Sequence, residues 1–228
     1  MIKCYIQWLD TIDEEPELDG AGKLLAPVFA ELLYDRKVKT LYEWCCGPSW
    51  IGLWLLEQGI CEELVVSDIN PKAIDCVRRT ISKHNYSVRS YLSDNLKDIP
   101  KHEKFDIIVA NPPNYMNIQE SHPLGFLRHD LRPSDIDWKI HIDFYNNIGN
   151  YMHTDSNMYI SEVEPYKKEV WFMNELYDKR KTEPIKDFKE MLFKNNLKLN
   201  HVERYMMDQE NDLPIELALL DISLDNSN

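Results

Sequence analysis

An Asn-Pro-Pro tripeptide at residues 111–113 directly follows an apolar run that ends at Ala110. The β-branched residues at 107–109 favour a buried strand. Because proline lacks a backbone N–H and fixes its own φ, the two prolines end the strand and hold the neighbouring carbonyl groups rigidly. The Asn111 amide oxygen and the Pro112 carbonyl oxygen are then two fixed acceptors, which suit the N–H groups of a nitrogen substrate.

Acidic and amide side chains follow three other apolar runs. Glu43 precedes a turn that contains Gly47, Asp68 ends the next run, and Asp94 and Asn95 follow the third. Ligands of open parallel sheets bind beyond the carboxyl ends of the strands. The spacing from Glu43 to Asp68 is close to that at which an acidic residue reaches a nucleoside ribose. These residues together predict a site for a nucleoside cofactor.

Each of these features also has a simpler explanation when it is taken alone. Asp68 could cap the helix that begins at Pro71, Asp94 could shape a turn, and Glu43 could be a solvated strand end. Asn-Pro-Pro is a common loop former as well. Their joint placement at consecutive strand ends favours the cofactor site.

Strand and helix patterns alternate from residue 38 onward, which is typical of right-handed βαβ units and a doubly wound, mostly parallel sheet. We expect an α/β fold with seven strands, at 38–44, 64–68, 87–92, 105–110, 157–163, 197–205 and 214–223. Helices are expected at 50–58, 71–85, 138–152, 165–177 and 185–195. One domain over residues 38–228 would then follow a short, acidic, largely helical lead at 1–37.

The composition limits the partners that we expect. The chain of 228 residues carries a net charge of −13, which leaves no basic surplus for phosphates, so nucleic acid is an unlikely partner despite the basic residues at 179–181. The longest apolar run, at 51–56, is far shorter than the roughly 20 residues that span a bilayer, so we expect no membrane association. The mixed, soon acidic N-terminal segment does not resemble a secretory signal, which predicts a cytoplasmic location.

The five cysteines are an odd number without a repeated Cys-x-x-Cys pair. This pattern argues against a disulfide framework and against a zinc site, so no metal is expected. Cys45 and Cys46 are interpreted as small buried residues of a tight corner rather than as reactive thiols.

The order of the motifs resembles that of the class I S-adenosylmethionine-dependent methyltransferases. The motifs are Glu43-x-x-x-Gly47, Asp68-Ile69-Asn70-Pro71, Ser93-Asp94-Asn95-Leu96 and Asn111-Pro112-Pro113. More narrowly, the chain is similar to the HemK/PrmC-type N-methyltransferases, whose hallmark is Asn-Pro-Pro-Tyr. The resemblance covers about residues 38–163 and implies a Rossmann-like fold with S-adenosyl-L-methionine as the cofactor.

The resemblance also implies roles for single residues. Asp68 would bind the ribose hydroxyls, Ile69 would pack on the adenine, and Asp94 and Asn95 would read the adenine edge. The turn around Gly47, with Glu43 before it and Cys45 inside it, would shape the methionine end of the cofactor site.

Two departures from the family pattern bear on these roles. The glycines usual on either side of Gly47 are replaced by Cys45 and Ser49, so the loop must pass the cofactor with side chains present. Asn114 stands where the hallmark has Tyr, which removes a ring that would stack on a planar substrate, and Tyr115 could substitute for it.

The expected activity is methyl transfer to an amino or amide nitrogen of a protein, a peptide or a small molecule, with Asn111 and Pro112 as the acceptors of the substrate N–H groups. One alternative is another S-adenosylmethionine-dependent reaction, an alkyl transfer or a cyclisation on a small amine. A non-catalytic scaffold is a second alternative, favoured by the two lost glycines and the short lead. The aromatic segment at 165–184 is either a substrate lid or further core packing. The oligomeric state is left open.

Overall fold

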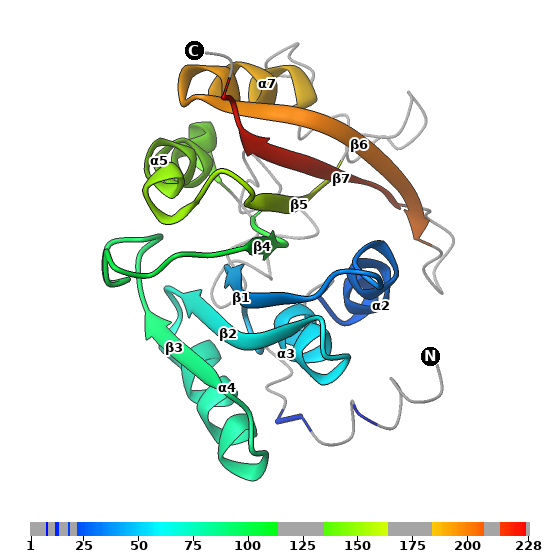
Figure 1. Cartoon of the computed structure of the whole chain (residues 1–228), viewed down its shortest axis with the longest axis vertical. Coiled ribbons are helices and arrows are strands. Elements are labelled where there is room, and N and C mark those ends of the chain that lie inside the picture. The colour runs from blue at the N-terminus through cyan, green and yellow to red at the C-terminus, as the bar shows by residue number, and fades with distance from the viewer. Residues whose placement is uncertain are drawn as a thin grey trace, which may run out of the picture. The chain divides into compact units, whose positions relative to one another are not determined.

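The computed structural model describes residues 8, 12–13, 18, 22–113, 135–163, 184–207 and 215–226. The chain divides into two compact units, residues 1–111 and 112–228. Figure 1 colours the chain from blue at the N-terminus to red at the C-terminus and labels its helices and strands. The two units are described separately below.

The seven strands are β1 (Val38–Trp44), β2 (Cys61–Asp68), β3 (Val88–Leu92), β4 (Ile107–Ala110), β5 (Asn157–Val163), β6 (Leu197–Met207) and β7 (Ile215–Leu224). Their order is β3-β2-β1-β4-β5-β7-β6 in one seven-stranded sheet. The predicted seven-stranded α/β fold is therefore confirmed, as a mixed sheet with helices.

In unit 1 the strands β1 to β4 run parallel, with β1 between β2 and β4 and with β3 beside β2. The helices of this unit are α2 (Gly22–Leu32), α3 (Trp50–Glu57) and α4 (Pro71–Lys83). Helix α3 packs on α2 and on β2, and α4 packs on β2 and β3. The centres of β1, β2 and β4 are fully buried, as at Leu41, Val65 and Ile108, because helices cover parallel strands, whereas no residue of the edge strand β3 is fully buried.

Helix α4 begins as its sequence predicts. Pro71 occupies the first turn, and the Asn70 side chain accepts a hydrogen bond from the Lys72 N–H at 3.0 Å. Asn70 is therefore the N-cap, and the simpler explanation of Asp68 as the cap does not apply.

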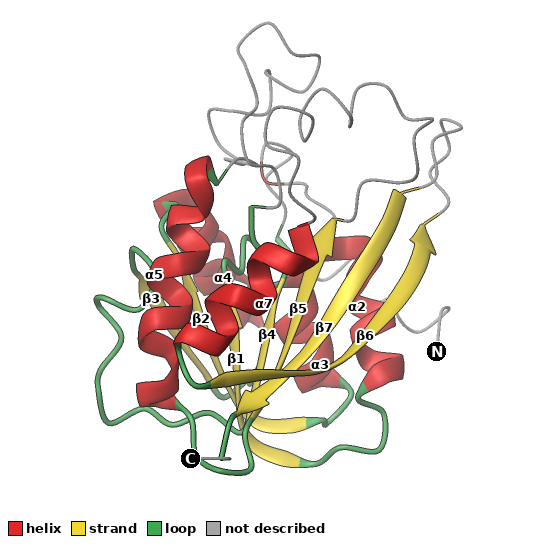
Figure 2. Ribbon diagram, turned by 90° about the horizontal axis from the view of Figure 1, so that it is seen from above, coloured by secondary structure: helices red, strands yellow, loops and turns green. Residues whose placement is uncertain are grey.

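In unit 2, β7 pairs antiparallel with both β5 and β6. The helices are α5 (Lys139–Ile148) and α7 (Pro184–Lys194), with 3-10 turns η3 (Ile136–Trp138) and η4 (Gly149–Tyr151) on either side of α5. Helix α7 packs on β6 and also contacts α5 (Figure 2). Phe144, Ile148 and Phe188 are completely buried in the core of this unit.

The differences from the expected elements are few. Helix α5 ends at Ile148 instead of residue 152, and the chain continues as the tighter turn η4. The expected helix at 165–177 and almost all of the segment at 165–184 lie outside the described residues. The domain boundary at residue 37 stays a prediction. Among the described residues, no helix has the length and apolar character needed to cross a membrane.

Candidate functional site

The carboxyl ends of β1 to β4 meet at one edge of unit 1. Because all four strands are parallel, the register places Trp44 beside Ser67 and Ala110, and Asp68 beside Leu92. The residues predicted at four separate strand ends are thus brought to this common edge.

The loop from Cys45 to Ser49 has an unusual backbone. Cys45, Gly47 and Ser49 have φ values of 52°, 52° and 64°, in the left-handed region that favours glycine. The chain therefore keeps, at Cys45 and Ser49, a conformation for which glycine is the usual residue. The loop thus follows this backbone path with side chains at Cys45 and Ser49, where the family pattern has glycines.

Glu43 lies directly before this loop and is only 2% exposed. Its Oε2 accepts hydrogen bonds from the Ser49 hydroxyl and from the Gly52 N–H, the latter at 3.0 Å. Burial raises the pKa of Glu43 to about 8, against the lowering effect of these hydrogen bonds. Glu43 is thus a buried group that joins the loop to the start of α3, not a solvated strand end.

Asp68 joins the same loop to the end of β2. Its Oδ2 accepts the Gly47 N–H at 2.8 Å, and its Oδ1 accepts the Asn70 N–H at 2.8 Å. Each carboxylate oxygen can accept more than one hydrogen bond, so a ribose hydroxyl can still donate to Asp68.

The surroundings of Asp68 fit an adenosine group. Ile69, the next residue in the chain, and Leu92, the β3 partner of Asp68, are 46% and 48% exposed, which is high for large apolar side chains. A Cβ added to Gly47 would have no atom within 4 Å, so the backbone there faces open space. The residues present therefore offer apolar surface for a base, a carboxylate for ribose and an accessible loop backbone.

Asp94 and Asn95 differ in their surroundings. The Asp94 side chain is 53% exposed and forms an ion pair with Lys97. Asn95 is buried, adopts φ 54° and accepts a hydrogen bond from the Trp44 indole N–H at 2.9 Å. Asn95 is thereby tied to the end of β1, whereas Asp94 remains accessible at the same edge.

Asn111 and Pro112 follow β4 directly. Asn111 and Pro113 are partly exposed and Pro112 is buried. Asn114 and Tyr115, the residues predicted to face the substrate, lie outside the described part of the chain. The roles assigned to all these residues stay predictions.

The two cysteines of the loop differ in burial. Cys46 is buried, and burial together with the charge of Asp68 raises the pKa of its thiol well above the ordinary value. Cys45 is only partly buried, so the interpretation of both residues as buried applies to Cys46 alone. Among the described residues, no cysteine forms a disulfide.

The sequence analysis missed a buried charged cluster in unit 2. His141 of α5 lies between two carboxylates, with its Nδ1 2.7 Å from Asp135 Oδ2 and its Nε2 2.9 Å from Glu162 Oε1. The side chains of all three residues are at most 2% exposed. The only signal was the spacing of His141 from the buried Phe144 and Ile148, which puts it on the buried face of the helix.

Asp135 also accepts the backbone N–H groups of Ile140 and His141, at 2.9 and 3.0 Å. Burial lowers the pKa of His141, but the charge of Glu162 and the hydrogen bonds to both carboxylates outweigh it and raise the pKa to about 9. The imidazole is therefore protonated at neutral pH and links the start of α5 to β5.

A known family model matches slightly less than half of this chain. Residues 14–124 match the family described as Methyltransferase small domain. The match includes the strand ends of unit 1 and the Asn-Pro-Pro turn. This match to a methyltransferase family supports a methyltransferase enzyme that uses S-adenosylmethionine.

Curated relatives include the ribosomal RNA small subunit methyltransferase C of Actinobacillus pleuropneumoniae serotype 5b (strain L20). It is 32% identical over 114 residues, which are 50% of this chain and 33% of that protein. The aligned part thus spans only a third of that relative. The narrower likeness to HemK/PrmC-type enzymes stays a prediction.

Solved structures with the same fold include a ribosomal protein L11 methylase from Lactobacillus delbrueckii subsp. bulgaricus. Its TM-score is 0.57 at 14% identity, covering 91% of this chain and 81% of that one. M. capricolum TrmK, in complex with S-adenosylhomocysteine, has a TM-score of 0.55 at 10% identity and covers 93% and 70%. At these identities the similarity shows the fold alone.

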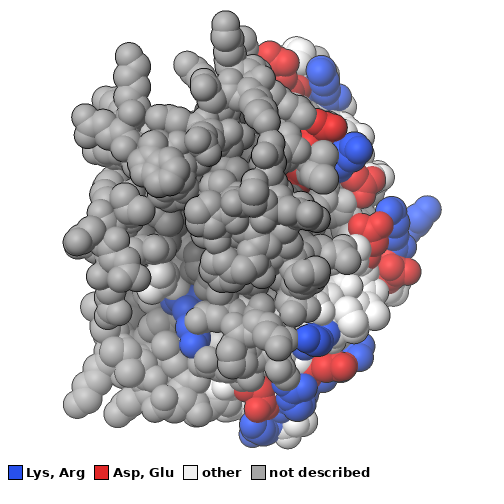
Figure 3. Space-filling model, turned by 180° about the vertical axis from the view of Figure 1, so that it is seen from behind, with Lys and Arg blue, Asp and Glu red and all other residues white. Residues whose placement is uncertain are grey.

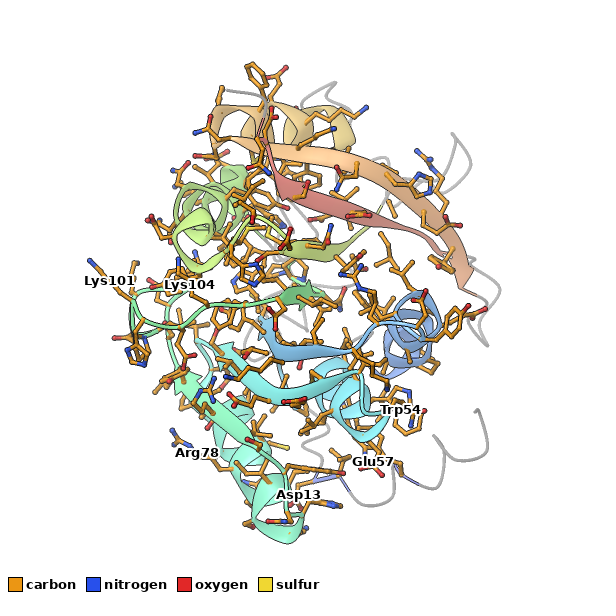
Figure 4. The ribbon with its side chains drawn as sticks, in the orientation of Figure 1. Asp13, Trp54, Glu57, Arg78, Lys101 and Lys104 are labelled. Atoms are coloured by element: carbon orange, nitrogen blue, oxygen red, sulfur yellow. The ribbon has the colours of Figure 1, made fainter. Side chains whose placement is uncertain are left out.

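The expectation that nucleic acid is an unlikely partner is wrong. A curated relative that matches this chain is named a ribosomal RNA methyltransferase. The physical reason lies in the distribution of charge, since residues 38–111 carry nine Lys and Arg against ten Asp and Glu, out of a net −13 for the whole chain. On the face in Figure 3, described basic and acidic side chains are interspersed. Arg78, Lys101 and Lys104 point away from the ribbon (Figure 4), so the chain-wide charge is a poor guide to local binding.

Proposed function

We propose that this protein transfers the methyl group of S-adenosylmethionine to an amino nitrogen of an RNA substrate. The single observation that carries the proposal is the Asn-Pro-Pro turn placed directly after β4, at the edge where Asp68 and the left-handed loop also lie. The RNA substrate is supported by the name of a curated relative, whereas the ribosomal protein L11 methylase, at 14% identity, shares the fold alone.

The chemistry requires positioning more than acid or base catalysis. When bound, S-adenosylmethionine supplies a methyl group on a sulfonium, which is already a good leaving group. Asn111 Oδ1 and the Pro112 carbonyl oxygen each accept one N–H of the substrate amino group, so that its lone pair points at the methyl carbon. Such alignment contributes several kcal/mol to a displacement reaction.

The same two acceptors stabilise the developing charge. As the nitrogen becomes positive in the transition state, its N–H groups become stronger donors, and the dipoles of the two acceptors are already aimed at them. The adjoining prolines restrict the backbone at this point, so that little reorganisation is needed.

The proposal is tested by incubating the protein with S-adenosylmethionine and either small-subunit ribosomal RNA or transfer RNA. We expect base methylation with S-adenosylhomocysteine as the co-product. Methylthioadenosine as the product would show alkyl transfer instead. Cofactor binding without methylation of any RNA, alongside methylation of a small amine, would contradict the proposed substrate class.

A further inference from the structure

Two carboxyl groups hold the loop at residues 45–49 in unit 1. Glu43 binds its far end through the Ser49 hydroxyl and the Gly52 N–H, and Asp68 binds its middle through the Gly47 N–H at 2.8 Å. Any change in the charge of Glu43 therefore acts on the same five residues that Asp68 holds.

The group is buried without a compensating cation. Glu43 is 2% exposed and, among the described residues, forms no ion pair. The charge of Asp68 acts on Glu43, and the charges of Asp68, Glu43 and Cys45 act on Cys46. All four groups are acids, so none of them supplies a positive charge. A buried carboxylate in such surroundings is costly, and the group is then more stable in its neutral form.

The hydrogen bonds oppose this effect but do not cancel it. The Ser49 hydroxyl and the backbone N–H groups of Gly52 and Ile51 favour the ionised form, whereas burial and the charge of Asp68 favour the neutral form. The balance leaves the pKa of Glu43 at about 8, so the carboxyl is mostly protonated at pH 7.

We propose that binding of S-adenosylmethionine at this loop releases a proton from Glu43. The inference rests on the proposed function, because the cation that drives the release is the sulfonium of the cofactor. The O–H bond of the carboxyl breaks, the proton goes to solvent, and no bond to the cofactor forms. Glu43 is in this view a positioning residue that senses the charge of the ligand through the electrostatic field.

Two consequences can be measured. Close to one proton should be released per cofactor bound at pH 7, falling towards zero above pH 9, where the free protein has already lost it. The affinity should correspondingly rise up to about tenfold between pH 7 and 9 and then level off.

Isothermal titration calorimetry in buffers of different ionisation enthalpy gives the proton number directly. The matched variant is Glu43→Gln, whose amide oxygen can still accept from Ser49 and Gly52 but which has no proton to release. The cofactor's own amino group titrates near pH 8 as well, so the difference between wild type and variant is the decisive quantity. S-adenosylhomocysteine, which lacks the sulfonium charge, should release clearly less.

Equal proton numbers for wild type and Glu43→Gln, or for the two ligands, would overturn the inference. A second experiment does not depend on the cofactor. Infrared difference spectra between ligand-free wild type and ligand-free Glu43→Gln at pH 7 should show a protonated carboxyl group that only the wild type has. Absence of that signal overturns the inference alone. If the signal is present and the wild type gives no binding heat, the proposed function fails and the inference falls with it.

Discussion

The backbone N–H of Gly47 donates to Asp68 Oδ2 at 2.8 Å, so the residue at the end of β2 holds the loop that follows β1. Asp68 is thus both a candidate ribose ligand and a part of the loop's own structure. Replacement of Asp68 should therefore affect cofactor binding and stability together.

Asp68→Ala leaves two backbone N–H groups, of Gly47 and Asn70, without their acceptor. We expect a loss of about 1–3 kcal/mol in the free energy of unfolding and a weakening of S-adenosylmethionine binding by at least about a hundredfold. Urea unfolding and calorimetry measure the two effects. Asp75→Ala is the control, because Asp75 is an exposed acid on α4 with only a weak 3.7 Å ion pair, and it should change neither quantity appreciably.

Asn111→Ala removes one of the two proposed acceptors of the substrate N–H groups. Methylation should fall by about a hundredfold or more, while the affinity for S-adenosylmethionine stays within about tenfold. Single-turnover assays and calorimetry on the same preparation give both values. Asn85→Ala, an exposed change after α4, is the control. Near-normal turnover of Asn111→Ala would mean that this amide does not serve as the acceptor.

Cys45→Gly tests the left-handed backbone at φ 52°. A non-glycine residue there costs about 1–2 kcal/mol, partly offset by the greater freedom of glycine in the unfolded chain. We expect Cys45→Gly to leave the free energy of unfolding unchanged or raised by up to about 1 kcal/mol, and Cys45→Val to lower it. Cys61→Gly, in strand β2, is the comparison and should destabilise the protein. A destabilising Cys45→Gly would refute this explanation.

Gly52→Ala tests how closely α3 approaches β1. A Cβ at Gly52 would lie 2.5 Å from Glu43 Oε2 and 2.9 Å from Leu64 Cδ1. Because Glu43 is hydrogen-bonded and Leu64 is in the core, we expect a loss of about 1–3 kcal/mol. The stability of Gly52→Ala is measured by thermal unfolding and compared with that of the control Gly149→Ala. The Cβ of this control would lie 3.8 Å from Leu224, an ordinary contact. Similar stability of the two variants would contradict the close approach.

The His141 cluster predicts loss of stability at alkaline pH. The folded-state pKa of His141, about 9, lies above the ordinary value of 6.5, so the contribution to stability is fully present below pH 6.5 and is lost as pH rises through 9. The decline amounts to up to about 3 kcal/mol. Urea unfolding between pH 7 and 10 should show a steeper decline in the wild type and in the exposed control His201→Gln than in His141→Gln, in which only other groups with raised pKa values, such as Glu43 and Cys46, still lose stability. An equally steep decline in His141→Gln would contradict the contribution of this cluster.

The order of the elements could be predicted from the sequence because strand and helix patterns are local. Runs such as 107–110 and 64–68 carry their own β propensity, and Pro71 with Asn70 marks the start of α4 without help from distant residues. Since parallel strands end at a common edge, the placement of Asp68, Asp94, Asn95 and Asn111 at that edge followed from the order alone. The segment at 165–184 and the residues at 114–115 remain predictions.

Burial and positive φ values were decided only by the tertiary structure, because both depend on contacts between residues far apart in the sequence. In the sequence, Glu43 resembles any solvated strand end, and only the packing of α3 shows that it is buried. Cys45 and Ser49 depart from the glycines of the family pattern, and only the structure shows that they keep a left-handed backbone. Asp135 and Glu162 together stabilise the protonated form of His141. No spacing rule brings together a helix residue and a carboxylate on a strand, so such pairs arise only when the chain packs.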